Sequence, residues 1–185
     1  MNRSAETEYE SQITSATLQQ SPLKAMEKLM GRFGTWFKKL IDPSYPVKHA
    51  MEEMALAYGM LERAHQHMEN GKADEAGVCL FGYAAASGIA KDDLKAVMHR
   101  EPPKINGPAA YFPKEPGQSD LDHWYDLCHR AMGLIDEAGR TTEGQDYYQA
   151  YLRLLGVSGA VEQMLETPKP GPCRYCKEGK MPWED

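Results

Sequence analysis

Apolar residues recur every three or four positions along most of this sequence, the spacing that places them on one face of an α-helix. One such stripe covers residues 23–41 and a second covers residues 47–68. Pro43 and Pro46 lie between them, and prolines remove backbone donors, so a helix ends there. Two matching stripes joined by a short turn predict an antiparallel helical hairpin. The second stripe consists of Val47, Met51, Met54, Tyr58, Leu61, His65 and Met68, with Ala50, Ala57 and Ala64 beside it.

The same pattern predicts further helices after the hairpin. Gly88 and Gly139 are expected to end two of them, because glycine lowers helix stability and often follows the last turn. No run of alternating β-branched residues, which is typical of a strand, occurs in the sequence. The predicted fold class is therefore all-α, a helical bundle built on the antiparallel hairpin. The later helices are expected over residues 73–87, 91–99, 120–138, 142–155 and 157–165.

Composition divides the chain into three parts. Residues 1–21 are rich in Ser, Thr, Gln and Glu, and are expected to form a flexible, disordered N-terminal tail. The helical bundle domain is expected over residues 22–166, with a long proline-rich loop at 101–118 that is either functional or a connector. Residues 167–185 form a Pro-, Gly- and Cys-containing C-terminal tail, which we do not expect to be helical.

The net charge of −6 is unevenly distributed. Residues 21–48 carry six Lys and Arg against two acidic residues, whereas residues 49–166 carry ten against nineteen. Affinity for a phosphate backbone comes from cations that displace counterions, so we expect no strong binding of duplex DNA. The sequence shows no secretory signal and no apolar stretch that would span a bilayer. We expect a cytoplasmic protein with reduced thiols.

Cys173 and Cys176 form a C-x-x-C pair followed by Gly179, which resembles one knuckle of a zinc ribbon. The pair supplies two of the four ligands that Zn²⁺ requires. The other ligands could come from the same knuckle of a second chain or from this chain. The candidates within this chain are Cys79, Cys128, His99, His123 and His129.

Three interpretations of the cysteine pair stay open: a zinc site, a metal-free tail without a cofactor, and a redox pair. The redox interpretation is less favoured, because redox pairs begin a helix while Pro172 and Gly179 indicate a loop. If zinc is bound, we expect two chains to share one ion. Cys128 lies on the buried stripe of its helix, so the tail would have to enter the core to reach it.

The helix predicted at residues 23–41 carries cations on one side and aromatic side chains on the other. This arrangement is typical of a helix that lies on a membrane surface or in the groove of a partner protein. It is also typical of one half of a hairpin core whose lysines face water, and the matching stripe at 47–68 favours this second interpretation. The candidate partner-binding residues are Lys28, Arg32, Phe33, Trp36, Phe37, Lys38 and Lys39.

Glu62 and His65 have the Glu-x-x-His spacing with which di-iron bundles hold their metals. Asp126 and His129 form a second pair of similar spacing, but both lie well away from the buried stripe of their helix. The further inward-facing carboxylates of such a site are not evident. We therefore expect His65 to be a histidine of the core or of the hairpin interface.

No phosphate-binding glycine loop, nucleophile elbow or H-E-x-x-H motif occurs in the sequence. The predicted function is non-enzymatic: a helical adaptor, inhibitor or assembly protein that binds a protein partner, with a second copy of itself as one candidate. Eleven methionines, which make adaptable surfaces, support this. The alternatives are a small nucleic-acid-associated regulator using the helix 23–41 and the zinc knuckle, and a metalloenzyme built in the bundle.

Overall fold

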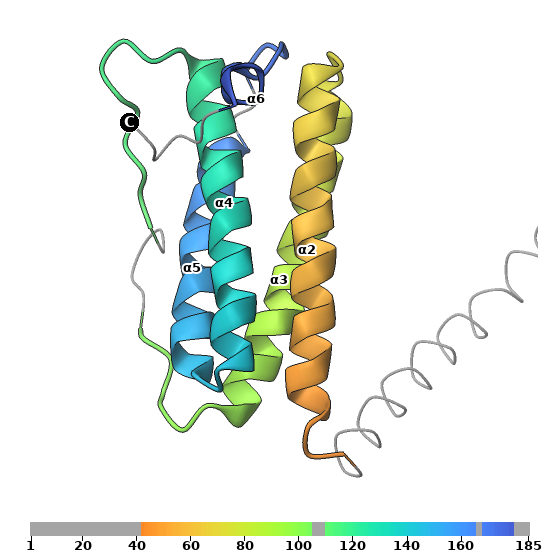
Figure 1. Cartoon of the computed structure of the whole chain (residues 1–185), viewed down its shortest axis with the longest axis vertical. Coiled ribbons are helices and arrows are strands. Elements are labelled where there is room, and N and C mark those ends of the chain that lie inside the picture. The colour runs from red at the N-terminus through yellow and green to blue at the C-terminus, as the bar shows by residue number, and fades with distance from the viewer. Residues whose placement is uncertain (1–41, 105–109, 166–167, 180–185) are drawn as a thin grey trace, which may run out of the picture. The chain divides into compact units, whose positions relative to one another are not determined.

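Four long helices and one short helix make up the described part of the chain (Figure 1). The computed structural model describes residues 42–104, 110–165 and 168–179. The helices are α2 (Tyr45–Glu69), α3 (Ala73–Val97), α4 (Asp120–Glu143), α5 (Tyr147–Met164) and α6 (Arg174–Glu178). None of the described residues belongs to a strand. The predicted all-α fold is confirmed.

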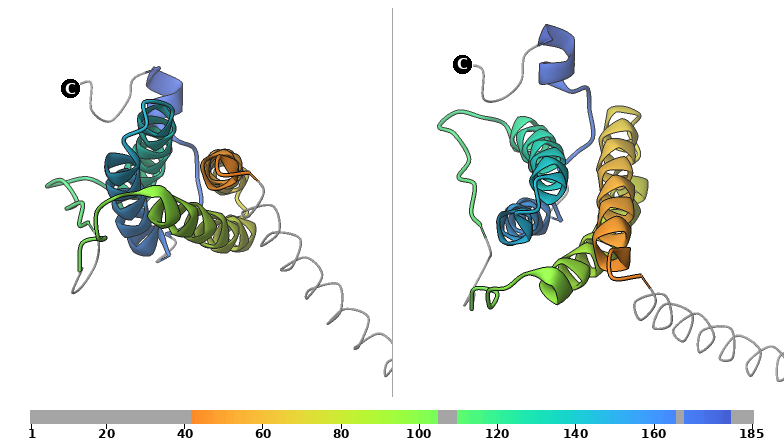
Figure 2. Two further views of the ribbon diagram at one scale, coloured as in Figure 1. Left: turned by 90° about the horizontal axis from the view of Figure 1, so that it is seen from below. Right: turned by 60° about the horizontal axis from the view of Figure 1, so that its bottom comes forward.

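The long helices form two antiparallel pairs within the unit that residues 46–185 make up. Residues 70–72 join α2 to α3, and residues 144–146 join α4 to α5. Helix α4 packs extensively on α5, and α3 also packs on α5. Figure 2 shows the four long helices around a common interior, as predicted for a bundle. The flexible tail predicted at 1–21 and the first hairpin helix at 23–41 lie outside the described residues.

Three predicted helix boundaries are wrong because glycines lie inside continuous helices. Gly88 lies within α3, Gly139 within α4 and Gly156 within α5. A glycine in a helix interior costs only about 1 kcal/mol relative to alanine. Burial of side chains on both sides of each glycine outweighs that cost, so the helix continues. Side-chain caps mark where the next helices begin: Ser119 Oγ accepts a hydrogen bond from the Asp122 amide at the start of α4, and Asp146 Oδ1 accepts one from the Gln149 amide at the start of α5.

The buried face of α2 is rotated away from the predicted stripe and toward the alanines that lie beside it. Tyr58 is 37% exposed although the pattern placed it on the stripe. The alanines beside the stripe are fully buried, and their small side chains allow neighbouring helices to come close. Cys128 Sγ of α4, for example, contacts the backbone oxygen of Leu61 at 3.6 Å. The buried apolar residues of α2 are Ala50, Met54, Ala57, Leu61, Ala64 and Met68.

Residues 110–118 of the proline-rich loop run along the outside of the bundle (Figure 1). Gly159 of α5 allows this close approach, because a Cβ there would lie 2.4 Å from the backbone oxygen of Ala110. Phe112 then donates its amide proton to Gln163 Oε1 at 3.3 Å. The loop thereby connects the end of α3 to the start of α4 while it covers α5.

The C-terminal tail enters the end of the bundle. Tyr125 of α4 donates its hydroxyl proton to the Gly171 backbone oxygen. Beyond Gly171, Cys173 is fully buried and Tyr175 is only 8% exposed. The tail also forms α6, so the prediction that it contains no helix is wrong. Five residues are enough for one turn, which ends at Gly179 with a left-handed φ of 65°.

Candidate metal centre

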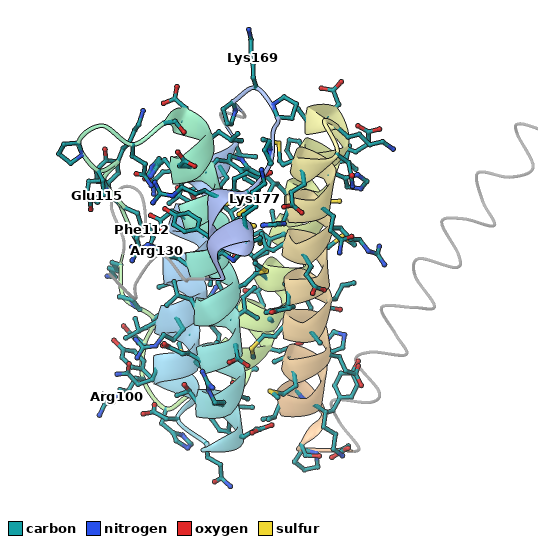
Figure 3. All side chains as sticks on the ribbon, turned by 45° about the horizontal axis from the view of Figure 1, so that its top comes forward. Arg100, Phe112, Glu115, Arg130, Lys169 and Lys177 are labelled. Atoms are coloured by element: carbon teal, nitrogen blue, oxygen red, sulfur yellow. The ribbon has the colours of Figure 1, made fainter. Side chains whose placement is uncertain are left out.

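Three elements bring two histidines and two cysteines together at the end of the bundle where α6 lies. His65 comes from the last third of α2 and His129 from the first half of α4. Cys173 occupies the N-cap position of α6, and Cys176 lies in the single turn of that helix. Residues three apart in a helical turn lie on the same side, so both sulfurs face the histidines. Figure 3 shows this end from above, with Lys177 of α6 over α4 and Lys169 pointing away from the bundle.

The ligand atoms of these four side chains all lie within 4.8 Å of one another. His65 Nε2 is 3.4 Å from Cys176 Sγ, and His129 Nε2 is 3.6 Å from Cys173 Sγ and 3.9 Å from Cys176 Sγ. A tetrahedral zinc ion, with bonds of about 2.0 Å to nitrogen and about 2.3 Å to sulfur, places its ligands about 3.3–3.8 Å apart. The four side chains therefore stand close to the spacing of a tetrahedral site, and they could bind a metal ion.

Burial shifts the pKa of both histidines and of Cys173. It lowers the pKa of His65, and it lowers the pKa of His129 to about 4, with the nearby His65 adding to the effect. Both imidazoles are therefore neutral at pH 7, which is the form that binds a metal. Burial also raises the pKa of the Cys173 thiol. A thiol in this environment keeps its proton until a cation replaces it, so metal binding releases that proton.

Aromatic rings and a carboxylate surround the imidazoles. The His65 ring lies 4.9 Å from the Tyr125 ring and 5.0 Å from the His129 ring, and the Tyr175 ring lies 6.0 Å from His129. On the other side of His65, Nδ1 lies 3.6 Å from Glu69 Oε2. A carboxylate at the second nitrogen of a metal-binding histidine favours the tautomer that leaves Nε2 free to bind. Glu69 thus lies just beyond hydrogen-bond distance of His65 Nδ1, on the side of the ring opposite the cysteines.

Of the ligands considered from the sequence, only His129 joins the cysteine pair. Cys128 is its neighbour in the chain, but its Sγ contacts the Leu61 backbone oxygen and belongs to the core. Cys79 lies in α3, and His99 is exposed beyond the end of that helix. His123 lies in the first turn of α4, and its buried Nδ1 has no hydrogen-bond partner within the described ranges.

His65 is the ligand candidate that the sequence reasoning missed. It is buried, as expected of a core histidine, but its ring faces Cys176 and His129. Two features of the sequence point to His65. It lies on an apolar stripe near the end of its helix, and Glu69 follows it by four residues. Glu62 is exposed and Asp126 pairs with Arg130 at 2.7 Å, so the Glu-x-x-His arrangement does not form.

The tail differs from two expectations. It was expected to stay outside the core, which favoured sharing of one ion between chains, yet Cys173 is fully buried. All four candidate ligands then come from one chain. The cysteine pair was expected in a loop, which disfavoured a redox pair, whereas Cys173 begins α6.

The partner-binding residues predicted in the helix 23–41 lie outside the described residues. Those residues are Lys28, Arg32, Phe33, Trp36, Phe37, Lys38 and Lys39. Within the described part of the chain, no helix combines the length and apolar character that crossing a membrane requires. Compared with family models, curated proteins and solved structures, the chain matches none.

Proposed function

We propose that the protein binds one Zn²⁺ ion through His65, His129, Cys173 and Cys176, and that this ion holds the C-terminal tail against α2 and α4. The observation that carries the proposal is the convergence of four ligand atoms within 4.8 Å. Two thiolates with two imidazoles form a set that zinc prefers, in tetrahedral geometry. Calcium and magnesium prefer oxygen ligands and do not suit this site.

A zinc ion with four protein ligands has a structural role. Catalytic zinc sites keep one position open for water or substrate, whereas structural sites are filled by side chains. Three of the four ligands are buried and Cys176 alone is exposed, which further limits access to the ion. A filled site supports the non-enzymatic function predicted from the sequence.

We propose further that the zinc-bound bundle acts by binding another protein. One face of α3 is apolar and exposed: Val78 is 70% exposed, Phe81 69% and Ile89 43%. Their spacing of three and then eight residues places all three side chains on one side of the helix. Exposed apolar side chains that gather on one face are typical of a protein-binding surface.

The zinc site is tested by measuring bound metal and mass in solution on the same sample. The expected result is one zinc ion per chain in a monomer, with cobalt substitution giving the intense absorption of thiolate-bound, tetrahedral Co²⁺. Cys173→Ser and His65→Gln should each weaken binding, whereas Cys79→Ser and His99→Gln should leave it unchanged. Half an ion per chain in a dimer would instead support the shared site, and absence of metal with a ready disulfide would support a redox pair.

The protein-binding face is tested by photo-crosslinking in the native host cell. A photoreactive amino acid in place of Phe81 should form a specific adduct with one protein, or with a second copy of the chain. The same amino acid in place of the exposed Glu52 on α2 is the control. Equal, unspecific adducts at both positions would contradict the proposed surface.

A further inference from the structure

A second candidate site lies between α3 and α5, and it shares no residue with the metal centre. The two helices leave a cavity of about 240 Å³. Leu80, Val161 and Leu165 give it apolar walls, and the exposed Phe81 stands at its edge. Ligand cavities for drug-sized molecules begin at about 300 Å³, so this cavity suits a smaller compound.

A buried hydroxyl in the lining is only weakly paired. Tyr83 is 1% exposed, and its OH makes no hydrogen bond of ordinary geometry to a described residue, although the hydroxyls of Ser87 and Ser158 lie near enough to interact with it. Each of these serines directs its own hydroxyl at a backbone oxygen of its helix, at 3.4 Å and 3.0 Å. A weakly paired buried hydroxyl costs free energy, which a bound acceptor atom would recover.

A lysine without a carboxylate partner lies in the same lining. Lys91 is half-buried and donates to Ser158 Oγ at 2.8 Å, and it forms no ion pair with any described residue. An ammonium group has three donors, so further donors of Lys91 stay available to a ligand. Burial lowers the pKa of this lysine, and the nearby charges of Asp92 and Glu162 offset that effect only in part. A negative ligand group would compensate the charge further.

We propose that this cavity binds a small carboxylate with a short apolar tail. The ammonium of Lys91 and the hydroxyl of Tyr83 would both donate to the carboxylate, and the tail would pack against Leu80, Val161 and Leu165. Glu162 also lines the cavity, where it is exposed to solvent and its charge acts on Lys91 and Tyr83. It opposes an anionic ligand only weakly, and its removal is expected to improve binding. This proposal does not depend on the zinc site.

The test uses hexanoate as the probe, titrated into the full-length protein as purified, with binding followed by chemical-shift changes. A ligand of this size is expected to bind with a dissociation constant on the order of 1 mM. Hexan-1-ol has the same tail without the charge, and hexylammonium has the opposite charge. Both should bind at least about tenfold more weakly, since a charge-assisted hydrogen bond contributes more than 1.4 kcal/mol, the equivalent of tenfold.

Four variants separate the proposed contacts from general effects on the fold. Lys91→Met and Tyr83→Phe should each weaken hexanoate binding by about tenfold, whereas Glu162→Gln should strengthen it. Lys95→Met is the matched control, because Lys95 lies one turn further along α3 and pairs with Asp92. Circular dichroism confirms that each variant is folded. No hexanoate binding at tens of millimolar, equal binding of hexylammonium, or full binding by Lys91→Met would overturn the proposal.

Discussion

Nε2 of His65 lies 3.4 Å from Sγ of Cys176, which joins the last third of α2 to the turn of α6. His129 makes the corresponding contact to Cys173, at 3.6 Å. Each histidine belongs to a different helix, so the cysteine pair links two helices that are not consecutive in the chain. A metal ion at this point would hold the tail and both helices together, and the first two predictions follow from that linkage.

Removal of zinc should lower the melting temperature and expose the tail. A ligand that binds only the folded state stabilises it by about 2.7 kcal/mol at a free concentration one hundred times its dissociation constant. For a domain of this size, each 1 kcal/mol shifts the melting temperature by about 2–4 °C. Differential scanning calorimetry with and without a chelator measures the shift. Amide exchange should increase in residues 171–179, and unchanged melting with unchanged exchange would contradict a structural ion.

Glu69→Gln should weaken zinc binding although Glu69 contacts no metal. Its Oε2 lies 3.6 Å from Nδ1 of His65, so it would accept the Nδ1 proton and orient the imidazole once zinc is bound at Nε2. Loss of such an outer contact typically costs about 10–100-fold in metal affinity. Competition with a chromogenic chelator measures the affinity, and Glu62→Gln, which alters an exposed carboxylate on the same helix, is the control. Equal affinities of the two variants would show that Glu69 has no orienting role.

Gly159→Ala and Gly88→Ala should change stability in opposite directions. A methyl group at Gly159 would overlap the backbone of Ala110, at 2.4 Å, so the loop must move. Overpacking of this kind costs about 1–3 kcal/mol. Gly88 lies inside α3 with nothing within 4 Å of an added Cβ, and alanine there should stabilise by about 0.5–1 kcal/mol. Urea unfolding measures both, and a stable Gly159→Ala protein would mean that the loop is not held against α5.

Lys91→Met should stabilise the ligand-free protein at neutral pH, and the advantage should shrink as the pH rises. Burial lowers the pKa of Lys91 in the folded state, while the unfolded chain keeps the ordinary value near 10.5. The unfolded state therefore binds the proton more tightly. The wild-type protein gains stability as the pH rises through the folded pKa toward 10.5, and loses it as the pH falls.

Melting temperatures of the wild type and of Lys91→Met, compared at pH 7 and pH 10, measure this difference. The variant cannot gain stability in this way as the pH rises, because methionine does not titrate. Lys95→Met is again the control, since the pKa of Lys95 is raised by its contact with Asp92. A constant difference between wild type and Lys91→Met across this range would contradict a desolvated ammonium.

The cysteine pair and the helical periodicity could both be recognised from the sequence, whereas the lengths of the helices could not. Spacings of three and four describe which face of a helix is apolar, and this depends only on local geometry. Whether a helix continues through Gly88 or Gly156 depends on side-chain burial on either side. That burial is contributed by other helices and is not encoded in the neighbouring residues.

The sequence by itself determined an all-α bundle and a C-x-x-C pair able to supply half of a zinc site. Only the tertiary structure decided that His65 and His129 supply the other half, and that Lys91 and Tyr83 line one cavity. A histidine on an apolar stripe has the same local pattern whether it packs in the core or faces a thiol. Cys176 is 111 positions from His65 in the chain. Their contact depends on how α2, α4 and the tail pack together, because packing brings together residues that no local spacing relates.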